Sequence, residues 1–189
     1  MLLTSLPSLS SIPLRRPVLK GASALCLVGL TLACNAYADS VPSQDKNFMT
    51  KAAEAGNAEV AASKIALEKS SNPDVKEFAQ KMIGEHTQVG NQLKQLASGK
   101  DVSLPSEPSL VQRTEIAVLE KLKGSTFDKR YASMIGVSAH EDAVKLFQKN
   151  STSAKDPDVK NFAAQTLPGL QQHLQMGRDL KQKLDTAKK

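Results

Sequence analysis

Three histidines, His86, His140 and His173, are the residues of this chain whose types and spacing could do chemistry together. Each lies on the apolar side of a different segment with helical periodicity, and a fourth such segment carries Glu59 in its apolar stripe. Glu141, next to His140, is a further candidate ligand. Three imidazoles and a carboxylate form the donor set of a Zn, Cu, Ni or mononuclear Fe site.

A second interpretation of the same residues needs no metal ion. A histidine on an apolar stripe is commonly hydrogen-bonded to a carboxylate or a backbone carbonyl, because an unpaired polar group is costly to bury. Glu59 would then pair with His86 in one hairpin, and Glu141 with His173 in the other. The sequence leaves both hypotheses open and favours the structural His–Glu network.

The spacing does not fit a ferritin-type di-iron centre. That centre requires Glu-x-x-His on two helices, so that a carboxylate and an imidazole share one face. The residues three positions before His86 and His173 are Ile83 and Leu170, which are apolar. A serine elbow between a strand and a helix, with its glycine-rich oxyanion motif, is also missing from the pattern. These features favour a binding protein over an enzyme.

Helices must position the candidate residues, because apolar residues recur every three or four positions. The first such segment runs from about residue 45 to residue 69. Its apolar stripe consists of Phe48, Ala52, Ala55, Ala62 and Ala66. The position missing from that series is occupied by Glu59, so a carboxylate stands in the seam of an otherwise apolar helix face.

The helices come in pairs, because one motif occurs twice. Residues 72–79 read NPDVKEFA and residues 156–163 read DPDVKNFA. Asn72 and Asp156 are favourable N-caps, and the proline after each suits the first position of a helix. Each copy opens a long amphipathic segment and follows another one. The repeat therefore predicts two helical hairpins.

A longer connection joins the two hairpins. Residues 98–109 contain Gly99, Pro105 and Pro108 and are expected to form a loop. Residues 110–122 predict a short crossover helix closed by Gly124, and the next long helix is expected to be capped at Ser125 or Thr126. Short hairpin turns with one longer middle connection are typical of an all-α, ferritin-like four-helix bundle.

The height of each candidate along the bundle decides whether one site can form. Counted from the hairpin turns at about 1.5 Å per residue, Glu59 and His86 differ in height by roughly 6 Å. His140 and His173 differ by roughly 10 Å, unless the third long helix extends to Ala154 or the fourth is kinked. A single four-ligand site therefore depends on how the second hairpin is built.

Residues 1–38 predict an export signal that is removed. A basic region with Arg15-Arg16 precedes an apolar stretch at residues 21–33, which is too short to span a bilayer. Ala36-Tyr37-Ala38 matches a cleavage site of the A-x-A type. Processing would leave residues 39–189 as a single bundle domain in the periplasm.

Two alternatives concern the export route. Arg15-Arg16, followed by the sequence PVLK, also resembles a twin-arginine signal, a route that carries folded and sometimes metal-loaded proteins. Cys34 offers lipidation as a minor alternative. Both cysteines, Cys26 and Cys34, lie within the signal. The processed chain would therefore have no thiol for a disulfide or a thiolate metal site.

The net charge of +6 is due in part to the signal. The signal holds three of the 25 basic residues and none of the 19 acidic ones, so residues 39–189 carry 22 basic residues and a net charge of +3. No basic cluster interleaved with aromatic residues remains, so nucleic-acid binding is not expected. No transmembrane anchor is expected either. A protein partner and the oligomeric state are left open.

The order of the motifs resembles a known family. The motifs, in order, are Phe48 with Glu59, NPDVKEFA at 72–79, MIGEH at 82–86, GSTFDKRY at 124–131, His140, and LPGLQQHL at 167–174. This order is similar to that of a bacterial exported family named domain of unknown function 4142, which is placed among ferritin-like folds. The resemblance covers nearly all of the chain after the signal. It implies a ferritin-like fold and a periplasmic location, and the family has no settled activity.

The two interpretations of the polar residues predict different functions. The first is a periplasmic binding or interaction protein of the envelope-stress type, without catalysis, whose His–Glu network is internally satisfied. The second is a protein that binds a transition-metal ion in the bundle core through the same histidines and glutamates.

Overall fold

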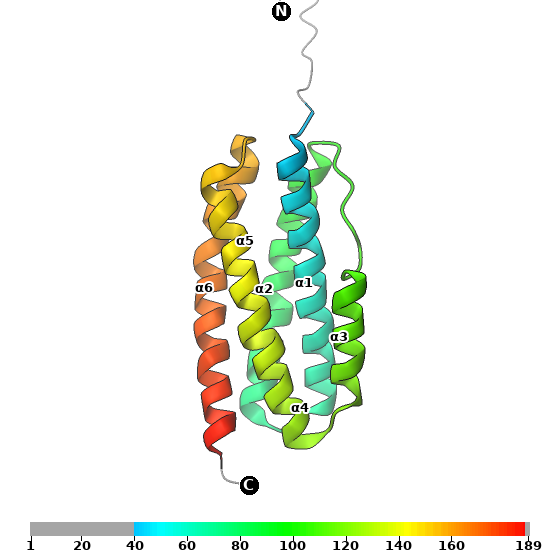
Figure 1. The fold of residues 1–189 in the computed structure, drawn as a ribbon, viewed down its shortest axis with the longest axis vertical. Helices are drawn as coiled ribbons and strands as arrows, with labels where there is room; N and C mark the ends of the chain where they lie inside the picture. Colours follow the sequence, from blue (N-terminus) through cyan, green and yellow to red (C-terminus); the bar gives the residue numbers. More distant parts are fainter. Residues whose placement is uncertain (1–39, 188–189) are drawn as a thin grey trace, which may run out of the picture. The chain divides into compact units, whose positions relative to one another are not determined.

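The computed structural model describes residues 40–187 as a set of helices (Figure 1). The helices are α1 (Ser43–Lys69), α2 (Pro73–Ser98), α3 (Leu110–Lys121), α4 (Gly124–Tyr131), the π-helix η1 (Ala132–Ala139), α5 (His140–Ser153) and α6 (Pro157–Thr186). The export signal predicted for residues 1–38, with its cysteines, lies outside the described residues. Within residues 40–187, no helix is long and apolar enough to cross a membrane.

Two helical hairpins make up the bundle, as the repeated motif predicts. α1 and α2 form the first hairpin, and α5 and α6 form the second (Figure 1). α4, η1 and α5 follow one another without a break and together make the third long helix. α3 lies beside α1 as the crossover helix (Figure 1). The all-α four-helix bundle with a helical crossover is therefore confirmed.

Side-chain caps start the two helices that carry the repeated motif. Asn72 Oδ1 accepts hydrogen bonds from the backbone N–H groups of Asp74 and Val75, at 2.9 and 3.2 Å. Asp156 Oδ1 accepts from the corresponding groups of Asp158 and Val159, at 2.9 and 3.1 Å. Each cap satisfies backbone donors that a helix start leaves unpaired.

The cap predicted for the third long helix is wrong. α4 begins at Gly124, and the preceding Lys123 makes no side-chain cap. Ser125 and Thr126 already lie inside the first turn of α4. The reason is the backbone of Gly124, whose φ of +53° turns the chain from the crossover into the helix at a conformation that favours glycine.

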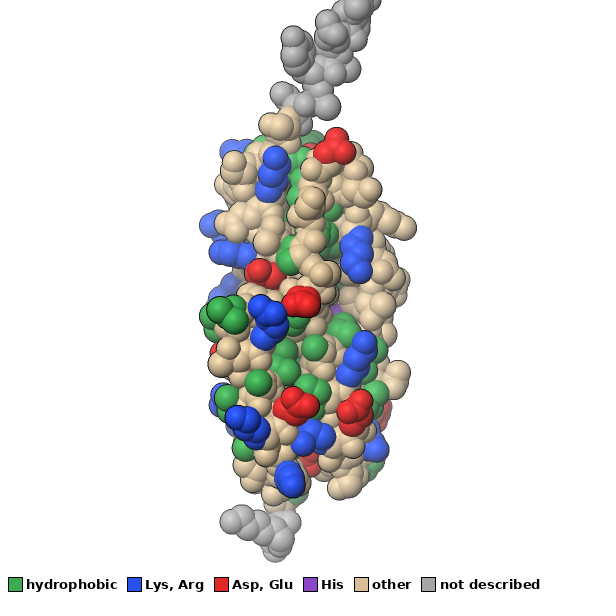
Figure 2. Space-filling model, turned by 90° about the vertical axis from the view of Figure 1, so that its right-hand side faces the viewer, with side chains coloured by type: hydrophobic (Ala, Val, Ile, Leu, Met, Phe, Trp, Pro, Cys, Tyr) green, Lys and Arg blue, Asp and Glu red, His purple; other side chains and the backbone are tan. Residues whose placement is uncertain are grey.

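The core consists of two apolar clusters with a polar layer between them. One cluster includes Ala62, Met82, Ile135 and Leu180, and the other includes Ala52, Leu93, Ala143 and Leu170. On each long helix, one candidate residue falls between the positions that belong to the two clusters. On the face that carries α3, only a small area of histidine surface is visible (Figure 2).

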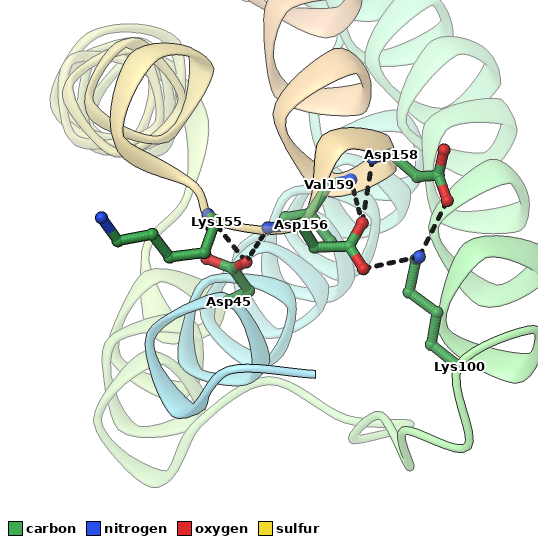
Figure 3. Close-up of polar contacts among 6 residues, drawn as sticks. All are labelled: Asp45, Lys100, Lys155, Asp156, Asp158 and Val159. Carbon is green, nitrogen blue, oxygen red and sulfur yellow. Dashed lines mark hydrogen bonds and ion pairs between the residues drawn. The ribbon is translucent and has the colours of Figure 1, made fainter. Parts of the chain in front are cut away.

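A buried carboxylate ties the two hairpins together at one end of the bundle (Figure 3). Asp45, near the start of α1, accepts hydrogen bonds from the backbone N–H groups of Lys155 and Asp156, at 3.0 and 2.7 Å. Lys100, just after α2, pairs with Asp156 and Asp158, at 2.7 and 2.8 Å. These contacts hold α1 and α2 in register with the turn that precedes α6.

η1 and α6 touch each other through their backbones. A Cβ atom added to Gly177 would lie 1.9 Å from the carbonyl oxygen of Gly136. Gly136 is four residues before His140, and Gly177 is four residues after His173. Four residues are about one helical turn. The glycine contact therefore brings the helix faces that carry these two histidines close together.

We expect Gly177→Ala to lower the free energy of unfolding by about 3 kcal/mol, because the new methyl group meets backbone that has no room to move. Gly169→Ala is the matched control, since a Cβ there meets no atom within 4 Å. Alanine favours a helix over glycine by roughly 0.5–1 kcal/mol, so the control should be stabilised. Urea unfolding followed by circular dichroism measures both, and equal stability of the two variants would contradict the close contact.

Candidate metal centre

The three histidines of the sequence converge in the polar layer. His86 comes from α2, His140 is the first residue of α5, and His173 comes from α6. Their exposed fractions are 5%, 0% and 3%, so all three are buried. One ring nitrogen from each forms a group whose members lie within 4.8 Å of one another. The Nε2 atoms of His86 and His140 are 3.3 Å apart.

A backbone carbonyl of the π-helix orients the ring of His140. His140 Nδ1 lies 2.7 Å from the carbonyl oxygen of Ile135, five residues earlier. Because a carbonyl oxygen only accepts, Nδ1 carries the proton. The other nitrogen, Nε2, lies 3.3 Å from Nε2 of His86.

The carboxylate of Glu59 orients His86, again through Nδ1 of the ring. His86 Nδ1 lies 2.8 Å from Glu59 Oε2, across the first hairpin. Burial would raise the pKa of Glu59, but the charges of His86 and His140 and the hydrogen bond from His86 outweigh burial and lower it from 4.5 to about 2. Burial would lower the pKa of His86, but the charge and hydrogen bond of Glu59 raise it above 6.5. The carboxylate is therefore ionised although only 2% exposed.

His173 is held by a carboxylate on its other ring nitrogen. His173 Nε2 lies 2.5 Å from Glu85 Oε2, and Nδ1 is buried without a partner. Burial lowers the pKa of His173, and the charges of His86 and His140 lower it further. The hydrogen bond to Glu85 acts in the opposite direction but does not outweigh them. The side chain of Glu85 is 41% exposed and also pairs with Lys81. Water screens such a carboxylate more than it screens the buried Glu59.

Each imidazole is thus held by an oxygen on one ring nitrogen. The other nitrogens of His86 and His140 lie 3.3 Å from each other, and that of His173 has no partner among residues 40–187. This arrangement is typical of metal-ligating histidines, whose second nitrogen donates to a carboxylate or a carbonyl. Tetrahedral coordination with metal–nitrogen distances of about 2.0–2.1 Å places the nitrogens about 3.3 Å apart. His86 and His140 already have this separation. Some movement of the His173 ring would complete the triangle.

Not all of the residues predicted from the sequence gather at the centre. Glu59 lies behind His86, with its Oε1 3.8 Å from His140 Nδ1 and without a hydrogen-bond partner. Glu141 lies outside the cluster and pairs with Arg178 at 2.9 Å on the surface. The predicted pairing of Glu59 with His86 is therefore present, whereas Glu141 does not pair with His173.

Glu85 is the supporting residue that the sequence reasoning missed. Glu85 and His86 are adjacent and point about 100° apart on a helix, so the pair does not replace the Glu-x-x-His of a di-iron centre. Glu85 instead reaches across to His173, while His86 faces the core. The one sequence feature that could have indicated Glu85 is its position next to a histidine of the apolar stripe. Its i,i+4 spacing from Lys81, however, is also typical of an ordinary surface ion pair.

Comparison with known proteins identifies a family and no activity. The model of the family described as "Domain of unknown function (DUF4142)" matches residues 32–180. Neither a curated protein nor a solved structure matches the chain.

The hydrogen bonds predict a mixed set of tautomers in the metal-free protein. His86 and His140 should carry the proton on Nδ1, because their Nδ1 atoms face Glu59 and the carbonyl of Ile135. His173 should carry it on Nε2, which faces Glu85. Long-range ¹H–¹⁵N correlation spectra at mildly alkaline pH distinguish the two tautomers. Observation of an Nε2–H tautomer for His140 would contradict the geometry.

Proposed function

Because the chain belongs to the DUF4142 family, whose description assigns no activity, we propose a function from the site itself: the protein binds one divalent transition-metal ion through His86, His140 and His173. The sequence alone put a non-catalytic interaction protein first. The geometry favours the alternative, in which the same residues bind a metal.

The observation that carries this proposal is the direction of the three free nitrogens. The outer nitrogen of each ring is engaged by an oxygen, so the lone pairs of His86 Nε2, His140 Nε2 and His173 Nδ1 are left in a buried space. The 3.3 Å contact between two Nε2 atoms is a hydrogen bond only if one ring carries a second proton. The third nitrogen still has no partner. One cation at the centre would satisfy all three.

The interaction-protein hypothesis requires a network that is satisfied without a metal. Among residues 40–187, the buried Nδ1 of His173 has no hydrogen-bond partner. A buried polar atom without a partner costs about 1–3 kcal/mol. A metal-free network therefore accounts less well for these residues than a metal site does.

The donors indicate the class of metal ion. Imidazole nitrogens suit Zn, Cu, Ni and Fe, whereas Mg and Ca prefer oxygen ligands. The carboxylates of Glu59 and Glu85 stand directly behind two of the imidazoles and carry two negative charges. They balance a divalent cation and make the imidazoles that they hold more basic.

We propose in addition that the site operates in the periplasm. This part of the proposal rests on the export signal predicted for residues 1–38 and on a processed chain of residues 39–189. In that compartment the bundle would buffer or sense the metal ion.

We expect protein purified from the periplasm without a histidine tag to contain about one Zn, Cu, Ni or Fe ion per chain. His86→Ala and His173→Ala should each abolish binding, because either change removes one of three ligands. Elemental analysis and metal titration measure the stoichiometry, and circular dichroism checks that the variants remain folded. A wild-type protein that takes up none of these ions would refute the metal site.

Glu59→Gln should weaken metal binding by about 10–100-fold without abolishing it, because the imidazole of His86 loses a charged acceptor. Glu141→Gln is the matched control, since Glu141 pairs with Arg178 outside the cluster. Competition with a chelator of known affinity measures both dissociation constants. Equal weakening in the two variants would show that general electrostatics, and not support of His86, is responsible.

A further inference from the structure

We infer that the bound metal keeps one coordination position for a small exogenous ligand, which reaches it along a groove between α2 and α6. This inference rests on the proposed metal site. The ligand class is a small molecule that coordinates through nitrogen or oxygen and forms hydrogen bonds to the groove. We name the feature the α2–α6 groove, lined by Glu85, Gln88, Gln92, Asn161, Gln165 and Thr166 together with His86 and His173.

The protein provides three ligands to the metal, and the nearby carboxylates bind the histidines instead of the metal. Among residues 40–187, the group of side chains able to hold an ion consists of the three histidines alone. Glu59 binds Nδ1 of His86, on the opposite side of the ring from Nε2. Glu85 binds Nε2 of His173, on the opposite side from Nδ1. Zinc sites with three protein ligands leave the fourth position to water or substrate.

Two of the three ligands border the α2–α6 groove. It encloses about 590 Å³, which lies within the range of about 300–1,000 Å³ that is usual for small-molecule sites. His86 and His173 both line it, and their ring centroids are 5.1 Å apart. The unpartnered Nδ1 of His173 therefore belongs to a side chain that borders the groove.

The walls of the groove combine polar side chains with the apolar side chains of Val89, Leu96, Phe162 and Leu170. The amides of Gln88, Gln92, Asn161 and Gln165 can each donate and accept hydrogen bonds. The carboxylates at its edges are paired, Glu85 with Lys81 and Asp158 with Lys100. The groove therefore does not repel an anion as unpaired carboxylates would, and neutral and anionic donors are both admitted.

A competing route exists between α1, α2 and the segment before α3. That cavity encloses about 380 Å³ and is lined by His86 and Glu59, with Gly90 on its wall. It is bordered by one of the three ligands only. Histidine surface is visible on the side of the bundle that carries α3 (Figure 2), so this route needs a direct test.

Two glycines allow each route to be filled separately. Gly169 lines the α2–α6 groove and Gly90 lines the competing cavity. Both lie inside helices, and a Cβ atom at either position meets no atom within 4 Å. Gly169→Met and Gly90→Met are therefore matched variants that place the same side chain in one opening or the other, each four residues from a ligand histidine on the same helix.

The experiment uses protein loaded with Co²⁺, whose visible absorption reports changes in its coordination, and titrates it with azide and with imidazole. We expect each probe to change the spectrum of the wild type until the change reaches a plateau. Gly169→Met should weaken imidazole binding by about tenfold or more and leave Co²⁺ stoichiometry unchanged. Gly90→Met should behave like the wild type.

The outcomes separate this inference from the metal site itself. A wild type that binds no Co²⁺, Zn, Cu, Ni or Fe refutes both. A Co²⁺ protein whose spectrum does not respond to azide or imidazole overturns the open position alone. Loss of imidazole binding in Gly90→Met, with Gly169→Met unaffected, overturns the assignment of the groove.

Discussion

The ionised carboxylate of Glu59 at the middle of the bundle is the constraint on which the site depends. A charge that is 2% exposed is strongly unfavourable unless positive or hydrogen-bonding groups surround it. His86 supplies the hydrogen bond, and the charges of the histidines lower the pKa of Glu59 to about 2. The polar layer is thus a set of mutually dependent groups enclosed by apolar clusters, in which removal of one partner leaves another unpaired.

Two local departures from ideal helical packing make this layer possible. η1 supplies the carbonyl of Ile135 to His140, and the backbone contact between Gly136 and Gly177 brings η1 against α6. In a regular α-helix the backbone N–H groups bond to carbonyls four residues earlier, whereas in a π-helix the spacing is five. Larger side chains would separate the two helices. Both departures lie within one turn of a histidine, which is consistent with the frequent occurrence of π-helical segments at functional sites.

The same geometry links stability to metal binding. The two apolar clusters and the contacts of Asp45 and Lys100 hold the four long helices together on either side of the polar layer. The layer itself contains partnerless buried atoms, so it is the part of the bundle that gains most from a cation. A metal bound to the folded state would add stability in proportion to the logarithm of its free concentration.

The sequence by itself determined the helices, their caps at Asn72 and Asp156, the two-hairpin bundle and the three histidines as candidates, because helical periodicity and capping are local properties. Only the tertiary structure decided that the histidines converge, that Glu85 supports His173 and that Glu141 lies outside. Periodicity gives the direction of a side chain around its own helix. The relative height and rotation of two helices depend on how they pack. In this protein they depend on a π-helix and a glycine contact, which no local sequence pattern predicts.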